Sequence, residues 1–300
     1  MTLQYFQINS KDKISQVCEE VKLALKQGME PEKSSKGSFQ VFFLKDRQGS
    51  IIAVFKPEII NNQNINEYCA YLLDYKNFAG IPETIITSLD HPLWEGRSGI
   101  LQLFKSGAHL CRGETYHFDA SSVRRIALLD MRLLNLDRNI DNLLLSQNRC
   151  IPIDHNLVLP EYFGGCFFVW MDWEEAKTPF SVEEKAYVDS IHPEIDRELL
   201  LSLGIHARAA NFYFFATRAV QIGVSLGFTA YELGCFFQMR KWQSEDQQQH
   251  WEQSIVRDVI RSVGYKDNTN FLPSIEPFLQ EIQKVFKQSA IGQQIEPSSP

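Results

Sequence analysis

The two kinds of hydrophobic periodicity in this sequence are segregated along the chain. Up to about residue 105, short runs rich in aromatic and β-branched residues alternate with turn residues, which is typical of strands. Beyond that point, apolar residues recur mainly at helical spacing. The sequence therefore predicts an α+β fold, in which a small β-rich part precedes a larger and mainly helical part.

Individual elements are predicted from the same patterns. In the first part we expect a helix at 11–25, strands at 39–44, 51–55, 84–87 and 99–104, a polar loop at 61–66 and a helix at 67–75. In the second part we expect a small β pair at 143–145 and 150–153, and helices at 121–135, 182–190, 195–203, 206–226, 230–240 and 249–263. The last residues, 292–300, are polar and proline-rich and are expected to be frayed.

The composition excludes several classes of protein. The 300 residues are 44% apolar and 22% charged, which is enough for one large domain or two lobes. Because 30 basic residues stand against 37 acidic ones, with a formal net charge of -7, no nucleic-acid partner is expected. No window approaches the roughly 18 to 20 apolar residues of a transmembrane segment, so we expect a cytoplasmic protein that meets membranes only peripherally. The six cysteines contain no CxxC pair and are expected to be reduced thiols.

A single lysine, Lys56, ends the predicted strand at 51–55. Ahead of that strand lie a Gly turn and a stretch that includes Ser35, Gly37 and Ser38. Backbone N–H groups in such a stretch can contact triphosphate oxygens while a lysine ammonium reaches the same phosphates. The alternative is a solvated lysine at a strand end, and the sequence has no GxxxxGK[ST] phosphate-binding loop.

A second group of polar residues stands between apolar runs. Asp137 and Asn142 are five residues apart ahead of a short apolar strand, and Asp154 follows the returning strand twelve residues later. A carboxylate near an acceptor hydroxyl, with amide and carboxylate oxygens on a divalent cation, would suit phosphoryl transfer. The alternative is that these aspartates cap helices and form turns.

Both groups resemble the phosphatidylinositol 3-/4-kinase catalytic domain, most closely its type II branch and the plant gamma-type phosphatidylinositol 4-kinase-like proteins. The resemblance rests on AVFKP around Lys56, on DRNIDN from Asp137 to Asn142 and on IPIDHNLVLP from Ile151 to Pro160. Further blocks of similarity extend it, in family order, over roughly residues 34–240.

This resemblance implies a bilobal, protein-kinase-like fold and an ATP-dependent kinase activity. The implied N-lobe covers 1–105, the helical C-lobe covers 106–290 and a flexible tail covers 291–300. The expected ligands are ATP with Mg²⁺ or Mn²⁺. The expected partner is an inositol lipid at a membrane surface, or a protein substrate.

Residue by residue, the resemblance also implies roles. Ser35, Gly37 and Ser38 would cover the ATP phosphates. Lys56 would bind those phosphates, Glu67 would orient Lys56, and Gln102, Leu103 and Phe104 would form the hinge that holds adenine. Asp137 would be the catalytic aspartate, and Asn142 and Asp154 would bind the metal.

The sequence departs from the family pattern at several places. Asn139 stands where many members have a histidine, and a short Asn/Gln loop at 61–66 replaces an acidic stretch. After Asp154 comes His155-Asn156, where relatives often have a glycine; asparagine tolerates a positive φ better than most residues, so we expect Asn156 to accommodate it.

The sequence leaves three functions open: transfer to an inositol lipid, transfer to a protein, and nucleotide binding without transfer. Residues 150–176 contain no Lys or Arg, which disfavours an acceptor that already carries several phosphates. Phosphatidylinositol itself fits, and so does a protein hydroxyl; the third reading is a nucleotide-binding pseudokinase adaptor. The aromatic residues of 163–173 would either enter a bilayer surface or form core, and core is the favoured expectation.

Overall fold

The computed structural model describes residues 11–34, 40–57, 63–111, 118–243, 249–265 and 274–291. The chain divides into two compact units. Unit 1 comprises Met1–Gly113 and Asp141–Asn156, and unit 2 comprises Glu114–Ile140 and Leu157–Pro300. The predicted α+β class is confirmed, because the N-terminal region is rich in sheet and helices dominate the rest. The lobe boundaries at 105 and 290 stay predictions.

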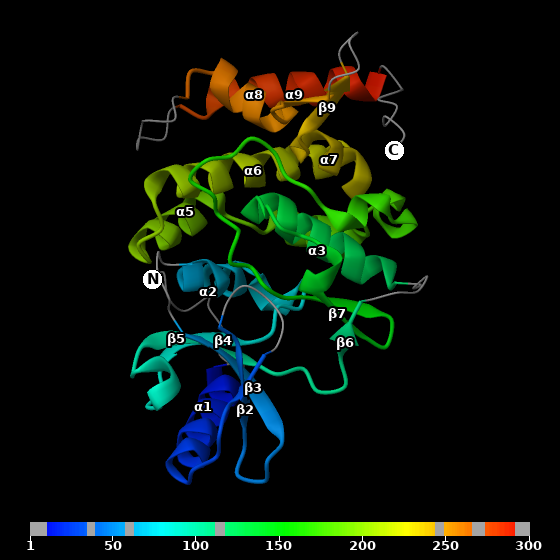
Figure 1. The fold of residues 1–300 in the computed structure, drawn as a ribbon. Coiled ribbons are helices and arrows are strands. Elements are labelled where there is room, and N and C mark those ends of the chain that lie inside the picture. Colours follow the sequence, from blue (N-terminus) through cyan, green and yellow to red (C-terminus); the bar gives the residue numbers. More distant parts are fainter. Residues whose placement is uncertain are drawn as a thin grey trace. The chain divides into compact units, whose positions relative to one another are not determined.

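Unit 1 contains a five-stranded antiparallel sheet in the order β1-β2-β3-β5-β4 (Figure 1). Its strands are β1 (Glu32–Lys33), β2 (Phe42–Lys45), β3 (Ile51–Pro57), β4 (Thr84–Ser88) and β5 (Ser98–Leu103). The turn between β2 and β3 is closed by the Asp46 side chain, which accepts from the N–H groups of Gln48 and Ser50, and Gly49 there has a positive φ of 86°. The predicted hairpin is therefore confirmed.

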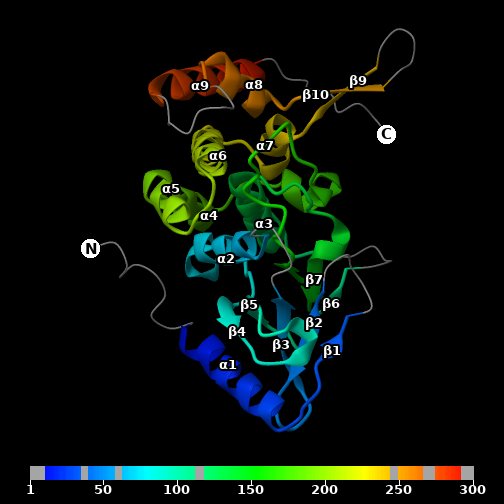
Figure 2. The same ribbon diagram turned by 60° about the vertical axis from the view of Figure 1, so that its left-hand side comes forward.

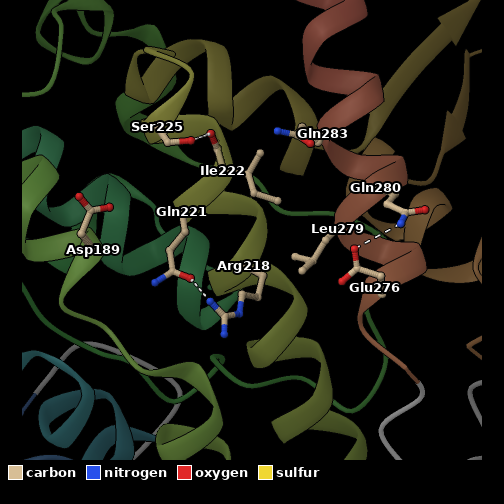
Figure 3. Close-up of a pocket in the computed structure, with 9 residues that line it drawn as sticks. All are labelled: Asp189, Arg218, Gln221, Ile222, Ser225, Glu276, Leu279, Gln280 and Gln283. Carbon is tan, nitrogen blue, oxygen red and sulfur yellow. Dashed lines mark hydrogen bonds between the residues drawn. The ribbon is translucent and has the colours of Figure 1, made fainter.

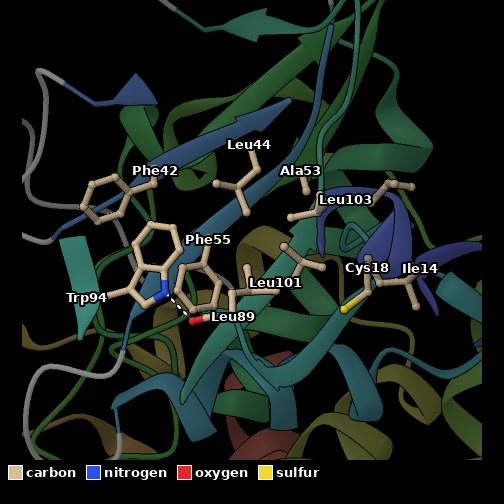
Figure 4. Packing of buried hydrophobic residues seen from close by; sticks show 11 residues of the cluster. Ile14, Cys18, Phe42, Leu44, Ala53, Phe55, Leu89, Trp94, Leu101 and Leu103 are labelled. Atoms are coloured by element: carbon tan, nitrogen blue, oxygen red, sulfur yellow. Dashed lines mark hydrogen bonds between the residues drawn. The ribbon is translucent and has the colours of Figure 1, made fainter. Parts of the chain in front are cut away.

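Two helices lie on opposite faces of this sheet, as Figures 1 and 2 show: α1 (Lys11–Lys26) on one and α2 (Gln63–Leu73) on the other. Side chains alternate between the faces of a strand, so Ala53 and Phe55 pack toward α1 while Lys56 points to the side of α2. Figure 4 shows the apolar cluster between α1 and the sheet, centred on Phe42, Phe55 and Trp94.

A second, three-stranded antiparallel sheet completes unit 1. It consists of β6 (His109–Leu110), β7 (Leu143–Ser146) and β8 (Arg149–Pro152), with β7 in the centre. The predicted β pair is thus confirmed as β7 and β8. Their hairpin is the feature that brings Asn142, at its start, close in space to the residues that follow β8.

Unit 2 is helical. Its helices are α3 (Ala120–Leu133), α4 (Val182–Asp189), α5 (Pro193–Ser202), α6 (Ala207–Ser225), α7 (Ala230–Phe237), α8 (Ile255–Ser262) and α9 (Glu276–Ile291). The central helix α6 is buried along most of its length, and it packs against α3 and, on another side, against α8 and α9 (Figures 1 and 2). Capping boxes start α4 at Ser181 and α7 at Thr229, which explains why both helices begin where helical periodicity predicts.

Three predicted elements are wrong in part. The helix predicted at 230–240 ends at Phe237, and the one predicted at 249–263 begins only at Ile255, because strands β9 (Arg240–Gln243) and β10 (Gln249–Glu252) pair with each other. A backbone ladder between separate segments is invisible to local periodicity. The polar loop predicted at 61–66 is also wrong from Gln63 onward, since those residues form the first turn of α2.

Several predictions concern the remaining features of the chain. The six cysteines are free thiols, as expected, and five of them are buried. Within the described ranges, every helix is too short or too polar to cross a bilayer. The stretch with Ser35, Gly37 and Ser38 and the tail at 292–300 lie outside the described residues.

Candidate active site

Lys56 is held between two carboxylates in unit 1. Its Nζ donates to Oε1 of Glu67 on α2, and it lies 3.0 Å from Oδ1 of Asp154, which follows β8. Glu67 is only 1% exposed and the Lys56 side chain 14%, whereas the Asp154 side chain is 37% exposed. The cluster is thus buried at its Glu67 end and open to solvent at Asp154.

The backbone around Lys56 is fixed by a close approach of β5 to β3. Gly99 of β5 is opposite Pro57 in the sheet, and a Cβ built on Gly99 would lie 2.4 Å from the carbonyl oxygen of Lys56 and 2.8 Å from the ring of Phe55. Only a residue without a side chain allows this approach. The register that aims Lys56 at α2 therefore depends on Gly99.

The three charges strongly influence one another. Burial alone would lower the pKa of Lys56, but the nearby carboxylates of Glu67 and Asp154 outweigh burial and raise that pKa, so the ammonium form is favoured. Burial raises the pKa of Glu67, and the Lys56 ammonium opposes this effect. A lysine that stays charged between two carboxylates is a fixed cation, which suits the binding of an anionic group.

The β7–β8 hairpin brings the chain at Asn142 close in space to the chain just before Asp154. Leu143 pairs with Pro152, and the N–H of Ile153 donates to the carbonyl oxygen of Asn142 at 3.1 Å. Asn142 is buried. It directly precedes β7, beside the end of β8 that leads to Asp154. The sequence-predicted pair of metal ligands therefore lies together in unit 1, although their role as ligands stays a prediction.

Asp154 has an unusual backbone conformation. Its φ is +57°, in the left-handed region that non-glycine residues seldom adopt. Asn156, which could have tolerated such a conformation in place of a glycine, is not among the described residues with positive φ. Instead, the carbonyl oxygen of Asn156 accepts from Nδ2 of Asn66 on α2 at 3.1 Å, which ties this segment to the helix that carries Glu67.

The donor set at the hairpin fits a hard divalent cation. A carboxylate oxygen from Asp154 and an amide oxygen from Asn142 are the kind of ligand that Mg²⁺ prefers. Within the described ranges, no three His, Cys, Asp or Glu side chains gather as a complete metal site. Two oxygen ligands match a cation that takes its other ligands from phosphate and water.

The predicted hinge residues lie at the end of β5. The side chain of Gln102 is buried and donates to Oγ1 of Thr84 at 2.9 Å. The N–H of Leu103 donates to Glu83, and the N–H of Phe104 donates to Ile52, both through carbonyl oxygens. These two N–H groups are therefore engaged within unit 1, and the role of the three residues as a hinge for adenine stays a prediction.

Asp137 belongs to unit 2 and follows α3. Helix α3 ends at Leu133, and the φ of +51° at the next residue, Leu134, turns the chain away from the helix. The N–H of Asp137 donates to Oδ1 of Asn135 at 3.0 Å, and Nδ2 of Asn139 donates to Oδ1 of Asp137 at 2.8 Å. The half-buried Asp137 carboxylate therefore sits on a loop whose conformation is fixed by hydrogen bonds on both sides.

Sequence reasoning missed a buried ion pair next to this loop. Asp130 and Arg138 have no exposed side-chain surface, and Nε of Arg138 lies 3.0 Å from Oδ2 of Asp130. Charged residues are predicted at the surface by default, so neither residue was a candidate. The available signal was an aspartate inside the apolar run from Ala127 to Leu134.

The aromatic residues between 162 and 173 differ in burial, and Trp173 is half-buried. Phe163, Phe168 and Trp170 are buried, as expected for core. Phe167 is 49% exposed and Tyr162 is 73% exposed. The guanidinium of Arg208 lies over the Tyr162 ring, 4.7 Å from the ring centroid. The core expectation therefore holds for Phe163, Phe168 and Trp170 and is wrong for Phe167.

A pocket of about 530 Å³ opens in unit 2 between α6 and α9 (Figure 3). Arg218 lines it and donates to Gln221 at 3.0 Å and to Glu194, and the carboxylates of Asp189 and Glu276 also line the pocket. None of the sequence-predicted site residues that the structure describes lines it.

Comparison with known proteins gives a consistent picture. The sequence model of a family described as "Phosphatidylinositol 3- and 4-kinase" matches residues 55–211, a range that contains Lys56, Glu67, Asp137 and Asp154. "Phosphatidylinositol 4-kinase gamma 4" of Oryza sativa subsp. japonica is 31% identical over 75% of this chain and 49% of its own length. The protein of the same name in Arabidopsis thaliana is 29% identical over 78% of this chain and 51% of its own length. "Phosphatidylinositol 4-kinase gamma 1" of Arabidopsis thaliana is 33% identical over 60% of this chain and 41% of its own length. The chain thus spans about half the length, or less, of these relatives.

Proposed function

This chain belongs to the phosphatidylinositol 3- and 4-kinase family, and we propose that it is an ATP-dependent phosphotransferase that moves the γ-phosphate of ATP to a hydroxyl of an inositol lipid. The observation that carries the proposal is the buried cluster of Lys56, Glu67 and Asp154. A fixed cation beside a solvent-reaching carboxylate is the arrangement that a metal–triphosphate ligand requires.

Lys56 and Glu67 act together in this proposal. The ammonium of Lys56 binds phosphate oxygens of ATP, and Glu67 holds the lysine side chain in place from the buried side. Without Glu67, the flexible four-carbon stem of lysine would have to be ordered at the moment of binding, which costs conformational entropy.

Asn142 and Asp154 would hold the divalent cation, Mg²⁺ or Mn²⁺. When bound, such a cation neutralises charge on the phosphate oxygens and orients them. Lys56 balances the charge of Asp154 until that ligand arrives, because the two groups are already 3.0 Å apart. The left-handed backbone at Asp154 is a local strain of the kind that often marks functional sites.

Asp137 would be the group that accepts the proton of the acceptor hydroxyl. Its carboxylate is half-buried, and Asn139 donates a hydrogen bond to it where many family members have a histidine. This contact gives Asn139 a role in orienting Asp137, so the departure from the family pattern is compatible with catalysis.

The proposed acceptor is a phosphatidylinositol that carries no additional phosphate. Residues 150–176 contain no Lys or Arg to bind further phosphates, and the relatives reported above are named phosphatidylinositol 4-kinases. The exposed Tyr162 and Phe167 would allow contact with a bilayer surface. We propose that the protein acts peripherally at the cytoplasmic face of a membrane. The protein hydroxyl considered above is an outcome of the test that follows.

The test is transfer of radiolabel from γ-³²P-ATP with Mg²⁺. Phosphatidylcholine vesicles that contain phosphatidylinositol are one acceptor, and a mixed protein fraction is the other. The proposal expects label in the lipid that depends on Mg²⁺ and is lost in an Asp137→Asn variant. Label in protein alone would replace the lipid acceptor with a protein hydroxyl. No label in either acceptor would make the chain a pseudokinase.

A further inference from the structure

The side chain of Asp130, in the last turn of α3, is a buried centre of hydrogen bonding. It is 0% exposed. It accepts from Nε of Arg138 at 3.0 and 3.1 Å, from Nε1 of Trp170 at 3.0 Å and from Nδ2 of Asn135 at 2.9 Å. Three side chains from two separate segments thus converge on one carboxylate.

Stability alone gives a poor reason for this arrangement. Removing a carboxylate and a guanidinium from water costs several kcal/mol for each ion, and a well-packed apolar pair is often at least as stable. Asp130 is preceded on α3 by Ala127, Leu128 and Leu129, and a leucine at 130 with an apolar partner at 138 would fill the same space without this buried ion pair. The network is better explained by what it positions.

Two members of the network flank Asp137 in the sequence. Asn135 uses Nδ2 to donate to Asp130, and its Oδ1 accepts from the N–H of Asp137 at 3.0 Å. On the other side, Arg138 is anchored directly to Asp130. Asp137, the proposed proton acceptor, therefore lies between two residues, Asn135 and Arg138, that both hydrogen-bond to the Asp130 carboxylate.

The same network reaches a second segment of unit 2. The N–H of Val169 donates to the carbonyl oxygen of Arg138 at 2.9 Å, and Arg138 forms a parallel bridge with Phe168. Trp170, in the same segment, bonds to Asp130 itself. A displacement of Asp130 would therefore move the loop of Asp137 and the 168–170 segment together.

We propose that Asp130 is a positioning residue for the phosphotransferase reaction. It sets the place of the Asp137 carboxylate through Asn135 and Arg138, and it links that place to the segment of Trp170. This inference rests on the proposed function, because it assigns Asp130 a part in the same reaction. Asp130 itself touches neither ATP nor acceptor in this account.

The experiment compares Asp130→Asn with a matched buried carboxylate. Asp196 of α5 is 1% exposed, and it pairs with Arg132 and accepts from Tyr213. Both variants lose one buried negative charge. We expect Asp130→Asn to lower kcat on the order of 10- to 100-fold with KM for ATP within about two-fold, and Asp196→Asn to keep kcat within about two-fold.

A second readout does not need activity. Hydrogen exchange at the amide of Asp137 should become roughly five-fold faster or more in Asp130→Asn, because the N–H of Asp137 loses an anchored acceptor. If Asp130→Asn does not fold, Asn135→Ala serves instead, since it leaves Asp130 and Arg138 paired and removes only the bridge to Asp137.

The outcomes separate the two proposals. Equal losses of kcat in Asp130→Asn and Asp196→Asn would reduce Asp130 to a structural residue, and unchanged exchange at Asp137 would overturn the positioning role outright. A wild-type protein that transfers no phosphate would overturn the proposed function. In that case, faster exchange at Asp137 in the variant would still support the geometric part of the inference.

Discussion

The Nζ of Lys56 lies 3.0 Å from Oδ1 of Asp154, although 98 residues separate them in the sequence. Strand β3 supplies the lysine and the β7–β8 hairpin supplies the aspartate, while Glu67 on α2 holds the lysine from the buried side. This contact joins one residue from each of the two polar groups that the sequence presents separately, and both residues belong to unit 1.

Replacing Lys56 with methionine should abolish phosphate transfer and also destabilise the fold. The methionine keeps the length of the stem but removes the charge, which leaves the buried Glu67 carboxylate without its cation. Breaking a buried pair in this way costs about 3–5 kcal/mol, which urea denaturation would measure. Lys45→Met is the control: Lys45 pairs with the exposed Glu32 at 3.4 Å, and its loss should cost about 1 kcal/mol or less.

The two effects of that substitution can be separated in a double variant. Lys56→Met with Glu67→Leu removes both buried charges, so most of the lost stability should return while phosphate transfer stays absent. Transfer that returned together with stability would show that Lys56 has only a structural role.

The Asp137→Ala variant should lower kcat by roughly 10² to 10⁴-fold, the range for a positioned acid–base group. Little stability should be lost, because the side chain is only half-buried. Asp141→Ala is a matched control with an exposed carboxylate four residues later. Wild-type activity in Asp137→Ala would remove Asp137 from the mechanism.

Asn139→Ala tests the residue that departs from the family pattern. The change removes the 2.8 Å hydrogen bond to Asp137, and a bond of that kind contributes about 1 kcal/mol, so kcat should fall roughly five-fold. Asn139→His should restore part of the loss if its ring can donate to the same oxygen. A kcat of Asn139→Ala equal to wild type would mean that the bond has no effect on catalysis.

Burial raises the pKa of Cys69 to about 12 from its ordinary value of 9.0. The folded state therefore holds this proton more tightly than the unfolded state does. The protonated Cys69 thiol should therefore leave the free energy of unfolding at its full value below about pH 9. As the pH rises from 9 toward 12, that free energy should fall by about 1.4 kcal/mol per pH unit. Denaturation at pH 8 and 10.5 measures it, and the decline should be smaller by about 2 kcal/mol in Cys69→Ala. Equal declines in both proteins would contradict the assignment.

Local signals were sufficient for much of the fold. The hairpin of β2 and β3 follows from apolar runs around a turn with Asp46 and Gly49, and the starts of α4 and α7 follow from their capping boxes. The strands β9 and β10 were missed because each is stabilised by backbone pairing with the other and carries no period of its own.

The candidate site was predictable in its residue types but not in its contacts. Spacing pointed to Lys56, Asn142 and Asp154 separately, and the family resemblance added Glu67. No spacing rule could predict that one ammonium would be shared by two carboxylates 11 and 98 residues away. The Asp130–Arg138 pair escaped for the opposite reason, since a buried charge contradicts the default that sequence reasoning applies.

The most direct measurement is a calorimetric titration of ATP into wild type and Asp154→Asn, each with and without Mg²⁺. If Lys56 and Asp154 form the site for a metal–triphosphate ligand, wild type should bind ATP more tightly with Mg²⁺, and Asp154→Asn should lose that difference. Equal dependence on Mg²⁺ in both proteins would contradict the account.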